Sequence, residues 1–511
     1  MNAIRKPTLW LIPCLIAQAA LMTHRLDLLP MWGDELFTMA AAQLPVGKMV
    51  DMVRGDVHPP LYFLLAHYWI RVAPGDALVQ LRLLSVVFAL LATIALDRLF
   101  LKHIPAPVRL WCLTLWTFSA CMLLYSRMAR SYSLQVLGFV IVCWAAWRWS
   151  QEFSSWKRLM ICAGSLAALL YTHYAPGFAA WAGVNVLLLP QVLKGARRRP
   201  GRRLTGNAIV LGAYLPWLML TSMLTAWRAR PGLLLVTGNT LAETGVKLAY
   251  WVFSFFYGEA IPVWMLPVTA LLAIPVVWLL WMGVRTGAAQ GVRAWLFAVA
   301  STTLLGFVVV AGWVSYAFVP ARLLFLLPLA LLAIAAGAYR APRAGSVIAA
   351  ALLAANLAGI GSYFQARDLL NIGYLAPLDR IARDIAGSSS PADTIVLVDG
   401  PNLSGVVLDY YLPGFSVRYI FDEQEAEAAW REVKAPVNRH VWFLRNPRDV
   451  TPGHVLERLE TEMRQSPEFT SQGKLHPYMS FSPTHKALMR LMNVQVSSDW
   501  MYAAWEFRKP S

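Results

Sequence analysis

The feature that most constrains this chain is a series of long apolar segments that recurs as far as Tyr363. Several of these runs approach the roughly 20 residues that an α-helix needs to cross about 30 Å of hydrocarbon. A helix also satisfies its own backbone hydrogen bonds, which lipid cannot do. Of the 511 residues 58% are hydrophobic and only 14% are charged, whereas soluble domains carry about 25% charged residues. The pattern predicts a polytopic α-helical membrane protein.

Hydropathy predicts about eleven transmembrane helices. They cover residues 8–26, 82–100, 109–125, 133–149, 158–173, 176–193, 206–226, 262–283, 294–313, 320–339 and 344–363. The first run resembles a secretory signal, but no small-residue cleavage site follows it, so we interpret it as a retained helix. The apolar segment 59–70 in the first outer loop is too short to span and is expected to lie at the membrane surface. Segment 247–257 is interpreted in the same way, with a further span as the alternative.

Basic residues gather in alternate loops between these spans. They are Arg5, Lys6, Lys102, Arg109, Lys157, Arg158, Lys194, Arg197, Arg198, Arg199, Arg202, Arg203, Arg285, Arg293, Arg340 and Arg343. The positive-inside rule assigns these loops to the cytoplasm, and the other loops to the opposite side of the membrane. Topology and attraction to anionic membrane lipids then explain the net charge of +17. Because no basic and aromatic stripe accompanies the runs, we expect no nucleic-acid partner.

Beyond Tyr363 the composition becomes that of a soluble protein. Strands are predicted at 394–398, 417–420 and 440–444, and helices at 403–411 and 452–464, the latter with Thr451 as its N-cap. The alternation predicts an extracytoplasmic α/β domain over residues 364–511, after a membrane domain over residues 1–363. The segment VDGPNLSG has neither the dinucleotide nor the Walker spacing, so no nucleotide is expected.

The first outer loop contains two adjacent carboxylates, Asp34 and Glu35, in MWGDELFT. Carboxylates are expensive to hold near lipid unless they have a task or a partner. The structural alternative makes Asp34 a helix N-cap with Glu35 in the first turn. The pair is therefore a candidate catalytic site whose local structural role is an open alternative.

The motif DVHPPLY places Asp56 and His58 two residues apart, before two prolines that give a rigid, extended entry into the next helix. A carboxylate and an imidazole so displayed could orient a phosphate or complete a site for a divalent ion such as Mg, Mn, Ca or Zn. Metal-ligand candidates are Asp56, His58 and His173, and a purely structural histidine is the alternative. The five cysteines all lie inside predicted spans and are expected to be packing residues.

Arg127 and Arg130 lie three residues apart in YSRMARSYSLQ, at the outer end of the third predicted span. Arginines at this spacing share a helical face and present planar forks that suit phosphate oxygens. Snorkelling to lipid headgroups is the alternative. His173 and Tyr174 at the outer end of the fifth span, and Arg322 in FVPARLLFLLP, are expected on the same side as Asp34.

In their order and spacing these motifs, with Arg82 of LRLLS, resemble the bacterial branch of the GT-C membrane glycosyltransferases. That branch includes the dolichyl-phosphate-mannose protein mannosyltransferases (glycosyltransferase family 39) and the lipid A aminoarabinose transferase. The resemblance implies transfer of a sugar from a polyprenyl-phosphate donor to an acceptor hydroxyl of a glycan, lipid or protein. It implies these site residues: Asp34 and Glu35 in catalysis; His58, Arg82, Arg127, Arg130 and Arg322 at the donor phosphate; and Asp56, Tyr62, Tyr132, His173 and Tyr174 nearby. Some members bind a divalent ion, so a metal is left open.

Direct attack by the acceptor, with Asp34 as base, would invert the configuration at the sugar. A transporter or flippase of a lipid-linked sugar is the alternative function, but the charged residues gather in outer loops and span ends rather than at the midplane. A catalytically silent binding or scaffold protein is the third functional hypothesis. Neither the sugar nor the acceptor is encoded in these motifs.

Overall fold

A computed structural model describes residues 8–55, 58–188, 200–221, 240–285, 299–301, 303–306, 308, 319–399, 406–420, 422–445, 455–469, 473–491 and 500–510. Contacts group the chain into two units. The first contains Met1–Leu26, Thr38–Glu259 and Trp264–Tyr363, and the second contains Asp27–Phe37, Ala260–Val263 and Phe364–Ser511. The boundary between residues 363 and 364 stays a prediction, because two earlier segments also belong to the second unit.

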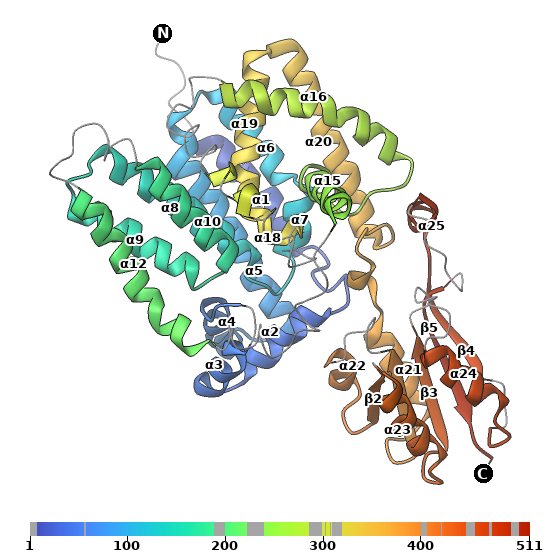
Figure 1. Cartoon of the computed structure of the whole chain (residues 1–511). Helices are drawn as coiled ribbons and strands as arrows, with labels where there is room; N and C mark the ends of the chain where they lie inside the picture. Colours follow the sequence, from blue (N-terminus) through green and yellow to red (C-terminus); the bar gives the residue numbers. More distant parts are fainter. Residues whose placement is uncertain are drawn as a thin grey trace. The chain divides into compact units, whose positions relative to one another are not determined.

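The described residues up to Gln365 are predominantly helical, as hydropathy predicts (Figure 1). The helices are α1 (Thr8–Thr23), α2 (Gly33–Gln43), α3 (Val46–Arg54), α4 (Leu61–Val72), α5 (Ala77–Ala95), α6 (Ala106–Thr117), α7 (Ala120–Ser126), α8 (Tyr132–Gln151), α9 (Trp156–Leu170), α10 (Tyr174–Leu187), α12 (Pro200–Leu220), α15 (Leu241–Tyr257), α16 (Met265–Arg285), α18 (Pro320–Leu323), α19 (Leu327–Arg340) and α20 (Pro342–Gln365). A π-helical turn (Leu96–Phe100) and a 3-10 turn (Leu101–His103) extend α5, and a second 3-10 turn (Leu324–Leu326) joins α18 to α19.

Length and composition qualify four helical segments of the described residues as membrane spans: Ala77–His103, Met265–Arg285, Pro320–Arg340 and Pro342–Gln365. The predicted span 109–125 is broken, because α6 and α7 meet at an angle of 50°. Most of the predicted span 294–313, and the ends of 176–193 and 206–226, lie outside the described residues. The polytopic class is therefore confirmed, whereas the number of eleven spans stays a prediction.

Two glycines allow α16 and α19 to pack with their backbones in contact. A Cβ atom on Gly283 would lie 1.7 Å from the carbonyl oxygen of Ala333, and one on Gly337 would lie 2.1 Å from that of Leu279. Small residues permit such close approach between membrane helices, where dispersion forces replace the hydrophobic effect. The pair therefore fixes one side of the helical bundle.

Arg109, which the sequence suggested as a loop cation, is buried instead. Its Nε donates to Oδ1 of Asp97 at 2.6 Å and its Nη2 to Oδ2 at 2.7 Å, and Asp97 is fully buried in the π-helical turn. A bidentate pair of this kind is strong and directional. It ties the end of α5 to the start of α6.

The C-terminal part of the second unit is a mixed α/β domain, as predicted. It contains a 3-10 turn, η5 (Ile372–Leu375), then α21 (Leu378–Ser388), β1 (Thr394–Asp399), α22 (Val406–Tyr411), β2 (Ser416–Ile420), α23 (Glu423–Lys434), β3 (His440–Arg445), α24 (Val455–Gln465), β4 (Lys474–Ser480), α25 (Pro483–Leu491) and β5 (Trp500–Arg508). The predicted strands and the described parts of both predicted helices are confirmed, and Thr451 lies outside the described residues. Sequence analysis did not find α21, α23, α25, β4 and β5.

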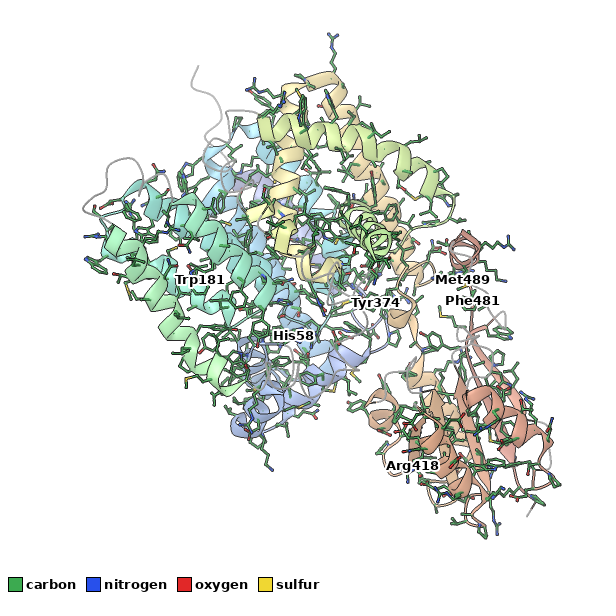
Figure 2. All side chains as sticks on the ribbon, in the orientation of Figure 1. His58, Trp181, Tyr374, Arg418, Phe481 and Met489 are labelled. Atoms are coloured by element: carbon green, nitrogen blue, oxygen red, sulfur yellow. The ribbon has the colours of Figure 1, made fainter. Side chains whose placement is uncertain are left out.

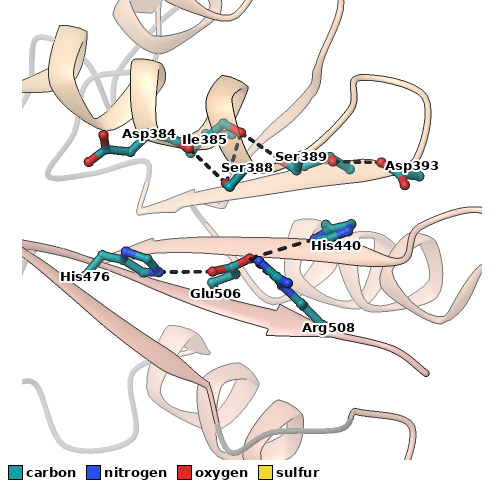
Figure 3. A network of polar contacts seen from close by, with 10 residues as sticks. Asp384, Ile385, Ser388, Ser389, Asp393, His440, His476, Glu506 and Arg508 are labelled. Atoms are coloured by element: carbon teal, nitrogen blue, oxygen red, sulfur yellow. Dashed lines mark hydrogen bonds and ion pairs between the residues drawn. The ribbon is translucent and has the colours of Figure 1, made fainter. Parts of the chain in front are cut away.

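The sheet has the strand order β2-β1-β3-β5-β4, with β1 parallel to β2 and β3, and β5 antiparallel to β3 and β4. One face is the hydrophobic core, where side chains such as Leu397, Phe443 and Phe507 pack against α23 and α24. Alternation along β5 turns Glu506 to the other face. There its carboxylate, 2% exposed, accepts hydrogen bonds from His476 Nε2 (3.1 Å) and Arg508 Nε (2.6 Å), as Figure 3 shows. These bonds compensate the buried charge.

Candidate active site

Four nitrogen-bearing side chains converge in the first unit, and we call them the cationic cluster: His58, Arg130, His173 and Arg322. Arg130 is 3% exposed, and its Nη2 lies 3.2 and 3.1 Å from Nδ1 and Nε2 of His58. The rings of His58 and His173 are perpendicular, with centroids 5.6 Å apart. Figure 2 shows His58 at the end of the bundle where α3 and α4 lie. The charges of Arg322 and Arg130 both act on His173, so these four residues predicted from separate motifs are neighbours.

His173 lies between α9 and α10 and caps the N-terminus of α10. Its Nδ1 accepts a hydrogen bond from the backbone N–H of Ala175 at 3.2 Å. Burial and the nearby positive charges of Arg322 and Arg130 oppose a second proton on the ring of His173. Because Nδ1 accepts a hydrogen bond, the neutral ring carries its proton on Nε2.

The Nε2–H of His173 is buried and has no hydrogen-bond partner among the described residues. A buried donor left without an acceptor costs free energy, so such an atom indicates a missing ligand or water. The nearby guanidinium groups of Arg130 and Arg322 and the N-terminus of α10 all favour negative charge. The cluster is consequently suited to an anion with several acceptor oxygens, such as a phosphate.

Neighbouring elements hold Arg130 in place from several sides. Its carbonyl oxygen accepts from Ser85 Oγ at 3.2 Å, and Ser85 Oγ is 2.8 Å from the hydroxyl of Tyr62, which is buried. Its guanidinium lies 6.0 Å from the ring centroid of Phe63 and within 3.4 Å of Thr38 Oγ1. Tyr62, predicted as a site residue, therefore helps to position Arg130.

Arg127 and Arg82 have different surroundings from Arg130. Arg127 Nη1 donates to the carbonyl oxygens of Leu21, Met22 and His24 at 2.7–3.1 Å, and its Nε donates to the hydroxyl of Tyr363 at 2.9 Å. Arg82 Nη1 donates to the carbonyl oxygen of Leu26 at 3.0 Å. Both arginines therefore bind the end of α1 and the chain that follows it.

The two predicted catalytic carboxylates lie in the first turn of α2, which begins at Gly33. Glu35 is fully buried, whereas Asp34 is partly exposed. Both belong to the second unit, where the ring of the preceding Trp32 contacts the ring of Tyr374 edge-on, with centroids 5.0 Å apart. Of the pair, Asp34 is the carboxylate that solvent and a substrate can reach.

Sequence analysis missed a group of buried polar side chains around Glu259. The side chain of Glu259 is 1% exposed and accepts a hydrogen bond from the hydroxyl of Tyr125, whose ring stacks edge-on with that of Tyr132, a predicted site residue. Burial raises the pKa of Glu259 to about 6. A lone acid in an apolar context, FYGEA, was the available signal. The last predicted residue, Tyr174, accepts from Trp217 Nε1 at 3.0 Å.

The described residues fit an anion better than a metal ion. Among them, no three histidine, cysteine, aspartate or glutamate side chains gather closely enough to hold a metal. Asp56, one of the predicted ligands, lies outside the described residues. His58 and His173 are close to each other, but the guanidinium of Arg130 lies within hydrogen-bond distance of His58, and a fixed positive charge opposes cation binding.

A scan against protein-family models finds no match, and no curated protein matches the sequence. Solved structures do match. The crystal structure of ArnT from Cupriavidus metallidurans bound to undecaprenyl phosphate aligns with a TM-score of 0.52 at 12% identity, covering 98% of this chain and 97% of that one. Oligosaccharyltransferase AglB from Archaeoglobus fulgidus, in complex with an inhibitory peptide and a dolichol-phosphate, aligns with a TM-score of 0.52 at 11% identity, covering 94% and 74%.

A second structure of the Archaeoglobus fulgidus oligosaccharyltransferase, in complex with Zn and sulfate, has a TM-score of 0.50 at 10% identity, covering 93% and 72%. Similarity at such low identity establishes the fold alone. The chain therefore has the GT-C glycosyltransferase fold, a helical membrane domain followed by a small sheet domain. The structural resemblance predicted from the motifs is confirmed.

Proposed function

We propose that this protein is a glycosyltransferase that moves a sugar from a polyprenyl-phosphate donor to a hydroxyl group. The observation that carries the proposal is the cationic cluster, in which buried Arg130 lies 3.1 Å from His58 Nε2 and the rings of His58 and His173 are 5.6 Å apart. The N–H donor of His173 has no partner among the described residues. Support comes from the shared fold, since the ArnT and AglB structures hold undecaprenyl phosphate and a dolichol-phosphate. The positive-inside rule assigns the site and the C-terminal domain to the side away from the cytoplasm. The resemblance of the motifs to bacterial enzymes makes that side the periplasmic face of the inner membrane.

The cationic cluster would bind the donor phosphate and stabilise it as a leaving group. In the reaction the bond between the anomeric carbon and the phosphate oxygen breaks, and its electron pair stays on that oxygen. Arg130 and Arg322 supply fixed positive charge, and neutral His173 donates a hydrogen bond from Nε2. Preorganised donors aimed at developing charge are a large source of catalysis, typically about 10²–10³-fold for each donor.

Asp34 would be the general base. It takes the proton from the acceptor hydroxyl while the acceptor oxygen forms a bond to the anomeric carbon on the side opposite the phosphate. The products are the glycosylated acceptor with inverted configuration and free polyprenyl phosphate. Asp34 is partly exposed whereas Glu35 is fully buried, which supports Asp34 rather than Glu35 as the base. Arg82 and Arg127 would keep the end of α1 in place rather than contact the donor. No step is assigned to a metal ion.

The test compares the purified full-length protein with its Asp34→Asn variant, supplied with polyprenyl-phosphate sugars and membrane extract as a source of acceptors. We expect wild type to release free polyprenyl phosphate, and the variant to release it at least about 10²-fold more slowly. Asp51→Asn is the matched control, because Asp51 is an exposed carboxylate on α3 that pairs with Arg54 at 3.3 Å. It is expected to behave as wild type.

Two outcomes would contradict the proposal. If wild type releases no polyprenyl phosphate but moves the lipid-linked sugar between leaflets, and Asp34→Asn does the same, the protein is a transporter. If both aspartate variants lose activity equally, Asp34 is not the base. The configuration of the glycosylated product, read by NMR, tests inversion independently.

A further inference from the structure

A cavity of about 370 Å³ lies at the turn between α8 and α9, away from the cationic cluster. Arg148 on α8 follows Tyr132 by 16 residues, which places the cavity about 24 Å along the helix from the end nearest Arg130. Arg148, Lys157, Arg158 and Glu152 line it, together with Trp144 and Ile161. Its volume lies within the range of small-molecule sites, roughly 300–1,000 Å³.

The charge of this cavity is unbalanced. Arg158 is compensated, because its Nη2 pairs with Glu152 at 2.6 Å and its Nη1 donates to the carbonyl oxygen of Arg148 at 2.8 Å. In the part of the chain that the structure describes, neither Arg148 nor Lys157 has a carboxylate partner. The cavity therefore presents two uncompensated positive charges, those of Arg148 and Lys157.

The lining changes from charged to apolar within one turn on both helices. Lys157 and Ile161 are four residues apart on α9, and Trp144 and Arg148 are four apart on α8, so each cation shares a helical face with an apolar side chain. Ile161 is 40% exposed, and its neighbour Met160 is 51% exposed, as expected for residues that face lipid chains. A ligand that fits this cavity has an anionic head and an apolar body.

Aromatic side chains lie on α8 and α9 close to the cavity. Trp156 opens α9, is 53% exposed and lies 5.2 Å from the guanidinium of Arg202, and Trp147 contacts His103 at 6.3 Å between centroids. Tryptophan concentrates at the boundary between hydrocarbon and headgroups. The cavity is therefore at headgroup depth.

We propose that the cavity between α8 and α9 is a binding site for an anionic glycerophospholipid, with the phosphodiester between Arg148 and Lys157 and the acyl chains along Trp144 and Ile161. Basic pockets between membrane helices on the cytoplasmic side bind such headgroups. The site lies on the face that the positive-inside rule assigns to the cytoplasm and does not depend on the proposed transferase activity.

The experiment counts the lipids retained by the full-length protein in native mass spectrometry, after incorporation into nanodiscs of phosphatidylcholine with increasing phosphatidylglycerol. The Arg148→Gln/Lys157→Gln variant is expected to bind phosphatidylglycerol roughly 30-fold more weakly than wild type. The matched control, Lys102→Gln/Arg340→Gln, removes two exposed charges from the same predicted face outside the cavity and should change affinity less than about twofold.

A third variant tests the proposal by gain. Glu152→Gln frees Arg158 and adds one net positive charge, so it should bind phosphatidylglycerol about fivefold more tightly. Equal losses in the two double variants would show diffuse surface attraction and overturn the site. Displacement of the lipid by inorganic phosphate at equal concentration, or by polyprenyl phosphate in preference to phosphatidylglycerol, would also overturn it.

Discussion

Arg127 and Arg130 are three residues apart, yet their guanidinium groups bind different partners. Arg130 faces His58, whereas Arg127 donates to four backbone carbonyl oxygens near the end of α1. The chain between α7 and α8 explains the difference, because Arg127 caps α7 and the next regular turn begins only at Tyr132. The helical spacing that suggested a shared face does not apply outside a continuous helix.

The Arg130→Lys variant tests the cationic cluster directly. Lysine keeps the charge but loses the planar fork that binds two phosphate oxygens together. Charge-assisted hydrogen bonds contribute about 1.5–3 kcal/mol, so the Kd for polyprenyl phosphate should rise about 10–100-fold. Binding is measured by microscale thermophoresis, with Arg54→Lys on the exposed surface of α3 as control. An unchanged Kd would show that Arg130 does not contact the donor phosphate.

Glu259 gives the protein a predicted dependence of stability on pH. Burial raises its folded pKa from 4.5 to about 6. Because the folded state holds this proton more tightly than the unfolded state, stability is greatest below pH 4.5 and falls as pH rises through 6. The loss amounts to about 1 kcal/mol between pH 5 and pH 7.

The Glu259→Gln variant removes this titration while keeping an acceptor for the hydroxyl of Tyr125. In thermal-shift measurements the variant should lose less stability than wild type between pH 5 and pH 7. Glu432→Gln, an exposed carboxylate on α23, is the control and should follow wild type. Parallel pH profiles for wild type and Glu259→Gln would show that the buried carboxyl does not titrate in this range.

Among the elements, the broken span α6–α7 depends on a distant side chain. Asn356 of α20 accepts from the backbone N–H of Ala120, at the start of α7, at 2.9 Å and donates to the carbonyl oxygen of Phe256 at 2.8 Å. Ser119 caps the same helix end, its Oγ accepting from the N–H of Met122 at 3.2 Å. These bonds satisfy backbone groups that a break inside a membrane would leave exposed to lipid.

The end of α1 depends on Arg127 in the same way. An Arg127→Gln variant would leave several carbonyl oxygens without donors, so we expect a loss of about 3 kcal/mol in the free energy of unfolding. In contrast, the Kd of the folded fraction for polyprenyl phosphate should stay within about twofold of wild type, since Arg127 binds backbone. Stability is followed by thermal shift and affinity by thermophoresis. Reduced affinity with intact stability would instead place Arg127 at the donor phosphate.

At the scale of the whole molecule, the segment Asp27–Phe37 belongs to the second unit together with the C-terminal domain. The contact between Trp32 and Tyr374 joins the loop before α2 to the turn η5. A backbone hydrogen bond from the N–H of Ile261 to the carbonyl oxygen of Asp368 ties the segment Ala260–Val263 to the same unit. The proposed base, Asp34, is therefore held by the domain that follows the membrane helices.

The Tyr374→Leu variant tests this positioning role, which rests on the proposed function. Loss of an aromatic pair of about 0.5–1.5 kcal/mol should lower kcat roughly 2–10-fold with little change in KM for the donor. Tyr410→Leu, which alters an exposed tyrosine of α22, is the control. An unchanged kcat would show that the contact with Tyr374 does not position Asp34. A rise in KM of the same size as the expected loss in kcat would indicate a role in donor binding.

Local patterns were sufficient for the helical membrane class, the strands β1, β2 and β3 and the motif order that identified the GT-C fold. Apolar length and alternation are properties of neighbouring residues, so they can be read directly from the chain. The same patterns missed β4 and α23. In β4 the run KLHPYMS contains a proline and no β-branched residue, and in α23 the run EQEAEAAWREVK is dominated by charge.

The sequence by itself determined that this chain enters a membrane many times, that basic residues gather in alternate predicted loops, and that carboxylates, histidines and arginines cluster at the ends of the predicted spans. Only the tertiary structure decided that Arg130 joins His58 and His173, that Arg82 and Arg127 bind backbone carbonyls, and that Trp32 contacts Tyr374. The physical reason is distance along the chain. These partners are separated by tens to hundreds of residues, and their meeting depends on how helices pack, which no local periodicity encodes.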